Sequence, residues 1–202
     1  MARRARQSGG EDQGEGKAEG EIAQDEPICA ACLRERGSVC CEVAQGEKLA
    51  TLLLADVERI EEATGLPRHR FVEREELDPA ERLAYETARP LYRGVFVGNV
   101  RWGLKARKGA CVFLERGRGC TLPSQAKPMA CRLYPLDFDL AGEVTLLDAP
   151  HCLALERAQG PEHLLAMLGT SLSELERLRA QALAEGAHHA RHCKREQRRQ
   201  SP

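Results

Sequence analysis

The sequence is poor in aromatic side chains. Its 202 residues include four Phe, three Tyr and one Trp, which together make up 4% of the chain. Aromatic residues usually supply large blocks of buried surface, so we expect a thin apolar core. The chain also lacks a run of about 20 apolar residues, the length that a membrane-spanning helix needs. We therefore expect no membrane partner.

The sequence also lacks a large excess of either positive or negative charge. The 30 Lys and Arg residues balance 31 Asp and Glu residues, and the net charge of -1 argues against a wholly basic nucleic-acid binder. Arg3 and Arg4 near the N-terminus are not followed by an apolar segment, so the sequence predicts no secretory signal. These features together predict a cytoplasmic protein.

Catalytic motifs are absent as well. The chain contains no G-x-S-x-G, no H-E-x-x-H and no Walker-type or dinucleotide-type glycine loop. A Cys–His dyad stays open, because such dyads form in space and not in sequence. The sequence therefore argues against an enzyme without excluding one.

The chain is rich in cysteine, with nine residues of this type. In a reducing cytoplasm, clustered cysteines indicate metal or redox chemistry more than a disulfide framework. Eight of them fall into two groups, an early one and a later one. These eight are Cys29, Cys32, Cys40 and Cys41, then Cys111, Cys120, Cys131 and Cys152.

The spacing of the early group is typical of metal ligands. A C-x2-C pair such as Cys29 and Cys32 can bring both sulfurs to one tetrahedral ion through a tight turn, although redox loops share this spacing. If Cys40 and Cys41 lie in an extended segment, their side chains point to opposite faces. One sulfur would then serve one site and its neighbour another site or a packed interior.

The later group lies mostly in a basic segment. Residues 101–134 contain eight basic residues and one acidic residue, a net charge of +7. Metal-bound cysteines are thiolates, so this charge favours compensation of thiolates and their metal cluster. Two alternatives are a solvated basic surface and a phosphate-binding face that would contact nucleic acid.

Several spaced motifs occur together in one order. They are Cys29-x2-Cys32-x7-Cys40-Cys41, Gly109-Ala-Cys111-Val-Phe113-Leu114, Cys120 and Lys127-Pro128-Met-Ala-Cys131-Arg132-Leu-Tyr134-Pro135. This pattern resembles the YkgJ-type cysteine-cluster family over about 60% of the chain. The resemblance implies a zinc- or iron-chelating domain, sometimes labelled an iron–sulfur protein, with the eight clustered cysteines as ligands.

The sequence departs from the family pattern, and the resemblance also allows a second function. The family commonly has Arg where Lys127 stands, and Lys lacks the bidentate fork of Arg. Lys127, Arg132 and His151 are candidates for residues that support the metal ligands. The family resemblance also includes a flagellin lysine N-methylase, so a metal-containing enzyme is an alternative. The physiological role and the protein partner are left unassigned.

A second group of ligand-type residues lies near the C-terminus. His188 and His192 are four residues apart, and so are His189 and Cys193. If the last helix reaches them, each pair shares a face and could hold an accessory metal. Gly186 argues instead that the helix ends before them.

The chain divides by composition into three parts. We expect a disordered arm over 1–26, a cysteine-cluster metal-binding domain over 27–186 and a basic tail over 187–202. The fold class expected for the middle part is α+β, a small helix-rich domain organised around a cysteine metal cluster.

Local patterns predict individual elements of the middle part. They are a strand over 50–54, helices over 55–64, 79–88 and 161–168, a hairpin from 134–139 and 143–147, and a helix from about 172 to 186. The best-marked start is Asp78-Pro79-Ala80-Glu81, a capping box with Pro in the first helical position.

Overall fold

The computed structural model of the chain describes residues 28–37, 39–42 and 49–200. The α-helices are α1 (Ile28–Arg36), α2 (Leu54–Thr64), α3 (Pro79–Ala88), α4 (Met129–Leu133), α5 (Leu153–Arg157), α6 (Pro161–Met167) and α7 (Leu172–Gln200). Single 3-10 turns form η1 (Val39–Cys41), η2 (Arg68–Arg70), η3 (Pro90–Tyr92) and η4 (Ser124–Ala126). The expected arm, 1–26, lies outside the described residues.

The strands are short and pair two by two. They are β1 (Val72–Glu76), β2 (Val100–Leu104), β3 (Ala106–Arg107), β4 (Ala110–Cys111), β5 (Leu114–Glu115), β6 (Gly119–Cys120), β7 (Leu136–Phe138) and β8 (Val144–Leu146). The pairs β1–β2, β3–β4, β5–β6 and β7–β8 are all antiparallel. Helices and small antiparallel strand pairs together confirm the α+β class.

Two apolar clusters form the core. The α7 cluster gathers side chains from α4, α5, α6, α7 and η3, with Tyr92, Met129, Phe138, Leu153 and Leu175 at its centre. The β2 cluster lies between α2 and the strands and contains Leu52, Ile60, Phe71, Leu104 and Phe113. The two clusters spread the few aromatic rings over two separate centres.

The hairpin β7–β8 and the starts and stops of several helices match the sequence expectations. The Asp78 carboxylate accepts hydrogen bonds from the N–H groups of Ala80 and Glu81, and the Glu81 carboxylate accepts one from the Asp78 N–H at 3.0 Å. Gly65 ends α2 with φ of 67°, a left-handed conformation that glycine adopts without steric cost. These local signals need no tertiary partner, which is why sequence reveals them.

The strand predicted over 50–54 is wrong. Thr51 makes a single antiparallel bridge to Gly103, and Leu54 already begins α2. The apolar run is buried because Leu52 packs in the β2 cluster and Leu53 in the α7 cluster. An apolar run of this length fits a buried helix start as well as a strand.

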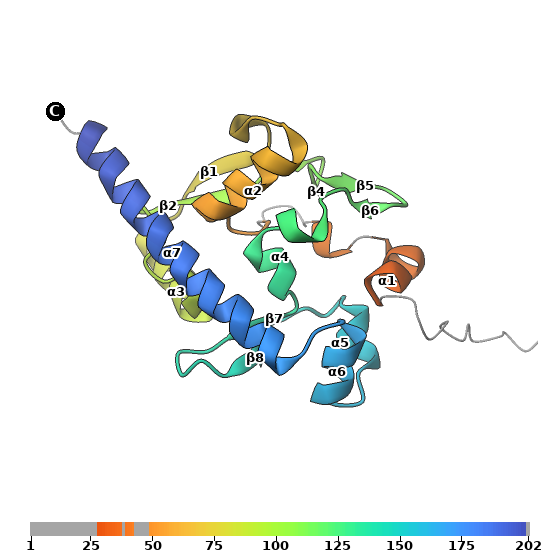
Figure 1. The fold of residues 1–202 in the computed structure, drawn as a ribbon. Coiled ribbons are helices and arrows are strands. Elements are labelled where there is room, and N and C mark those ends of the chain that lie inside the picture. The colour runs from red at the N-terminus through yellow and green to blue at the C-terminus, as the bar shows by residue number, and fades with distance from the viewer. Residues whose placement is uncertain (1–27, 38, 43–48, 201–202) are drawn as a thin grey trace, which may run out of the picture.

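The predicted end of the last helix is also wrong. Helix α7 continues past Gly186 to Gln200, and it runs along the molecule from the α5–α6 end to the β1–β2 end (Figure 1). At Gly186 a Cβ would lie 3.4 Å from Val95 Cγ1 and 3.7 Å from Leu91 O. The glycine therefore lets α7 pass close to η3. None of the described helices combines the length and the apolar character needed to cross a membrane.

Candidate metal centre

The first two cysteines lie on α1. Cys29 is exposed and Cys32 is partly buried, and they stand one helical turn apart. Helix α1 thus takes the place of the tight turn that this spacing also allows. Residues at i and i+3 of a helix nevertheless share a face, so the C-x2-C spacing still presents both side chains to the same side.

Helix α1 packs on α5 and is held there by two ion pairs. Arg157 Nη2 donates to Glu35 Oε2 at 2.7 Å. Arg36 donates to the carboxylate of Glu156. These contacts join segments about 120 residues apart in sequence.

This packing brings Cys152 to the α1 cysteines. Cys152 directly precedes α5, and the backbone of Leu153 forms a hydrogen bond with the Cys32 thiol. Cys32 and Cys152 pack against the same α7 cluster. Burial raises the pKa of Cys29 and Cys32, and charge on Cys152 raises both further. We call Cys29, Cys32 and Cys152 the α1 group.

Two cysteines of the later part lie on the second strands of two successive hairpins, β3–β4 and β5–β6. Cys111 ends β4 and Cys120 ends β6, and the Thr121 N–H donates to Phe113 O at 2.9 Å between them. Both pack in or against the β2 cluster. Burial raises the pKa of Cys111 to about 11, a backbone hydrogen bond with Phe113 opposes the rise, and charge on Cys120 adds to it.

Cys131 joins these two from α4. Asp56 positions α4, because its buried carboxylate accepts a hydrogen bond from the Met129 N–H at 2.9 Å. Cys131 keeps an exposed surface, yet α4 lies at the centre of the molecule (Figure 1). Partial desolvation raises the pKa of Cys131, and charge on Cys111 and Cys120 raises it further. We call Cys111, Cys120 and Cys131 the hairpin group.

The adjacent cysteines Cys40 and Cys41 stand between the two groups. They lie in the 3-10 turn η1 and not in an extended segment, and their thiols are hydrogen-bonded to each other. This bond and burial raise the pKa of Cys40. Charge on Cys40 raises the pKa of Cys29 and Cys32 in one group and of Cys111 and Cys131 in the other.

Pairwise electrostatic interactions link these thiols, but within the described part of the chain they do not form a closed ligand shell. Over residues 28–37, 39–42 and 49–200, no three His, Cys, Asp or Glu side chains are arranged to hold a metal ion. The donor chemistry fits zinc and iron, because both bind thiolate sulfur. Backbone hydrogen bonds to Cys32 and Cys111 are of the kind that stabilises thiolate ligands.

The basic segment 101–134 does not act as one unit around these sulfurs. Arg101 is buried and donates to Glu75 at 2.6 Å, and Arg118 pairs with Glu115 at 3.1 Å. Lys127 is different, because its ammonium lowers the pKa of both Cys29 and Cys40 against the effect of burial. Lys127 is thus a basic residue of this segment whose charge acts on two of the clustered thiols.

The two other supporting candidates adjoin Cys152 and Cys131 in the sequence. The exposed His151 has its carbonyl oxygen 3.4 Å from Arg36 Nη1. Arg132 has the charged groups of Arg59 and Arg177 as neighbours; burial and these two cations lower its pKa. Arg132 therefore faces the α2–α7 side.

Of the histidines near the C-terminus, His189 has a packing role. His189 and Cys193 share a buried face of α7, with Cys193 Sγ 3.4 Å from His189 Nε2. His189 Nδ1 accepts the Leu54 N–H at 2.9 Å, and the Trp102 ring meets the imidazole edge to face. His188 is exposed and His192 lies near the same Trp102 ring. Both nitrogens of His189 are therefore engaged within the protein.

Asp56 is a positioning residue that sequence patterns did not reveal. Its carboxylate also accepts the Leu53 N–H at 2.8 Å and an N–H of Arg59 at 2.6 Å. Burial raises the pKa of Asp56, whereas these donors oppose the rise. Arg59 in turn reaches Glu185 on α7 at 2.5 Å. One carboxylate thus ties α2, α4 and α7 together beside the hairpin group.

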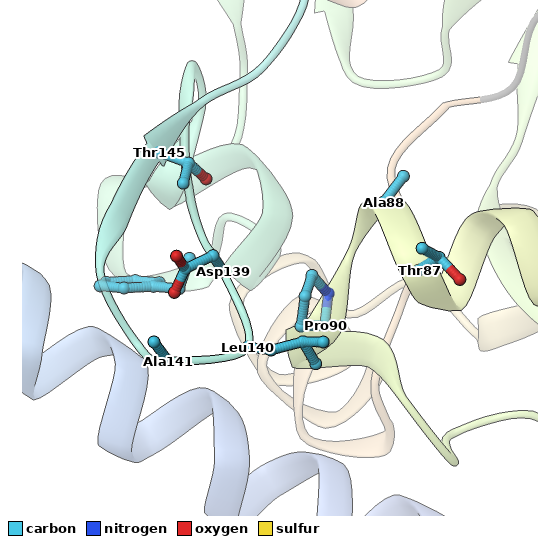
Figure 2. Close-up of a pocket in the computed structure, with 8 residues that line it drawn as sticks. Thr87, Ala88, Pro90, Asp139, Leu140, Ala141 and Thr145 are labelled. Carbon is cyan, nitrogen blue, oxygen red and sulfur yellow. The ribbon is translucent and has the colours of Figure 1, made fainter.

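An open hollow elsewhere on the surface is separate from the cysteines. It lies between the end of α3 and the β7–β8 hairpin and is lined by Thr87, Pro90, Asp139, Leu140 and Thr145, among others (Figure 2). Asp139 is engaged there as the acceptor for the Glu143 N–H at 2.9 Å.

Comparison with known proteins finds no matching family model, curated protein or solved structure. The resemblance to the YkgJ-type family is therefore carried by the cysteine motifs alone and stays a prediction.

Proposed function

We propose that this protein binds metal, zinc or iron, through its eight clustered cysteines, and that an iron–sulfur cluster is one form this metal can take. One observation carries the proposal. Helices α1 and α4, the turn η1, strands β4 and β6 and the start of α5 carry the eight cysteines, and pairwise electrostatic interactions through Cys40 connect the α1 group with the hairpin group. Segments as far apart as Cys29 and Cys152 take part.

Electrostatics gives the physical reason. Each thiol in such a cluster is harder to ionise because its neighbours would also carry negative charge. A bound cation reverses this effect, because it stabilises every thiolate at once and releases the protons. Four thiolates around a dication carry a net charge of about -2, and the ammonium of Lys127 reduces the cost of that charge.

Metal binding also suits a chain with a thin core. Structural zinc contributes on the order of 10–16 kcal/mol of apparent folding free energy in small zinc-binding peptides. Here the metal would join α1 and α5 to the hairpins, in addition to the exposed ion pairs that link α1 to α5. The thiolates require a reducing compartment, and the cytoplasm meets that requirement.

Anaerobic purification of the full chain tests the proposal. Elemental analysis should find zinc or iron bound in stoichiometric amounts, and absorption near 400 nm with acid-labile sulfide would identify an iron–sulfur cluster. Cys193→Ser is the matched control, because this buried thiol bonds His189 away from the other eight. It should leave the metal content unchanged.

Removal of the metal gives a second readout. Chelation should lower the thermal midpoint and expose the clustered thiols to alkylation. A chain purified without metal, with its clustered thiols freely alkylated or joined as disulfides, would contradict the proposal.

A further inference from the structure

We propose that the eight cysteines divide into two four-sulfur metal sites: an α1 site of Cys29, Cys32, Cys40 and Cys152, and a hairpin site of Cys41, Cys111, Cys120 and Cys131. This division rests on the proposed function, since it assumes that the cysteines bind metal. It adds which sulfurs share an ion and which parts of the fold each ion joins.

The α1 site follows from the packing of α1 on α5. The ion pair of Glu35 with Arg157 fixes the helix pair at its exposed side. On the inner side, Cys32 and Cys152 pack against one apolar cluster, and the Leu153 backbone contacts the Cys32 sulfur. Cys29 lies one turn before Cys32 on the same helix. Three sulfurs are thereby presented from two helices.

The hairpin site follows from strand register. Ala106 pairs with Cys111 and Leu114 pairs with Cys120, so the β3–β4 and β5–β6 hairpins hold their cysteines at consecutive strand ends. Cys111 and Cys120 pack in or against the β2 cluster. Cys131 comes to them on α4, whose first N–H is held by Asp56.

The adjacent pair supplies the fourth sulfur of each site. Glu42 forms an antiparallel bridge with Ala110, which places the residue before Glu42 beside the residue after Ala110. Those residues are Cys41 and Cys111, and Cys41 also packs against the β2 cluster. Cys40, in contrast, is exposed. Because Cys41 belongs to the hairpin site, we assign the sulfur of Cys40 to the α1 site. The adjacent backbone positions therefore keep the two ions close together.

Two nearby metal thiolate centres would concentrate negative charge. With two dications and eight thiolates the net charge is about -4. Lys127 acts on Cys29 and on Cys40, so its ammonium lies where the α1 site needs a counter-charge. The backbone hydrogen bond of Phe113 to Cys111 serves the hairpin site in the same way.

Each ion would hold a different part of the fold. The α1 site would lock α1 and η1 to α5, next to the α7 cluster. The hairpin site would lock η1 to β4, β6 and α4, next to the β2 cluster. Loss of one ion should therefore free one group of thiols and leave the other protected.

Alkylation of the zinc-loaded full chain, read by mass spectrometry, tests this division. In Cys152→Ser, the three remaining cysteines of the α1 site should become reactive while the hairpin site stays protected. In Cys120→Ser the pattern should be the reverse. Bound zinc should fall by half in each variant, and Cys193→Ser should keep the full amount.

The adjacent pair gives the sharpest comparison. Cys40→Ser should expose the α1 site, and Cys41→Ser should expose the hairpin site. If both variants expose the same set, or if either exposes all the clustered cysteines while its circular dichroism is unchanged, the division is wrong.

A measurement on the unsubstituted protein covers the case in which a variant fails to fold. Gradual removal of zinc by a chelator should release the thiols in two blocks of four with these memberships. Blocks of mixed membership, or release of all eight together, would overturn the division while leaving metal binding intact. A chain that takes up no metal at all would instead overturn the proposed function.

Discussion

Replacing Asp56 with Ala should destabilise the protein by about 2–6 kcal/mol. The buried carboxylate accepts the Leu53 N–H at 2.8 Å and the Met129 N–H at 2.9 Å. Each buried N–H left without an acceptor costs about 1–3 kcal/mol, and two such groups give this range. Arg59 adds little to the loss, because it retains Glu185 at 2.5 Å.

Urea denaturation of the protein as purified, followed by circular dichroism and Trp fluorescence, measures this change. Asp56→Asn keeps one acceptor oxygen, so we expect about half of the loss. Glu58→Ala is the matched control, since Glu58 is exposed on the same helix and should change stability by less than about 0.5 kcal/mol. A loss below about 1 kcal/mol in Asp56→Ala would refute the reasoning that this carboxylate joins α2 to α4.

Three further changes have expected outcomes that the same denaturation assay checks. Burial lowers the pKa of His189 from 6.5 to about 4, so the unfolded chain takes up a proton between these pH values and the folded chain does not. The free energy of unfolding should have its full value above pH 6.5 and should fall by at most about 3 kcal/mol towards pH 4. The variant His189→Gln should weaken this pH dependence. An unchanged pH dependence in this variant would contradict the role of His189. Gly186→Ala should stabilise α7 by about 0.5–1 kcal/mol, because the new Cβ makes ordinary contact with Val95; a loss of stability would show that the contact is too tight. Asp78→Ala should destabilise by about 1 kcal/mol, because α3 loses its capping box; an effect near zero would contradict the role of this cap.

Local sequence signals predicted the elements whose causes are local. The Asp78 box, the left-handed Gly65 and the hairpin turn before Glu143 each act within a few residues. Gly186 led to a wrong prediction of the helix end, because its role depends on a tertiary contact. A glycine near a helix end resembles a stop signal, but here it allows close passage past Val95 from a distant segment. Only the tertiary contact distinguishes the two uses.

Some features of the candidate site could likewise be predicted from the sequence, and others could not. Cysteine spacing divided the eight cysteines into an early and a later group, but the structure places Cys152 of the later group beside Cys29 and Cys32. Lys127 was singled out from the motif around Cys131. Asp56 had no signal, because a carboxylate in the first turn of a helix is common and its second acceptor role depends on Met129, 73 residues away. The conformation of Cys29, Cys32, Cys40 and Cys41 also differed, since helical and extended segments can both present closely spaced sulfurs.

The cysteines of the two proposed sites are nested along the chain. Every residue of the hairpin site, from Cys41 to Cys131, lies between Cys40 and Cys152. During translation, the last hairpin sulfur leaves the ribosome before Cys152 is available. Biosynthesis would therefore fill the inner site first, and a product that stops before Cys152 would still carry one complete set of ligands.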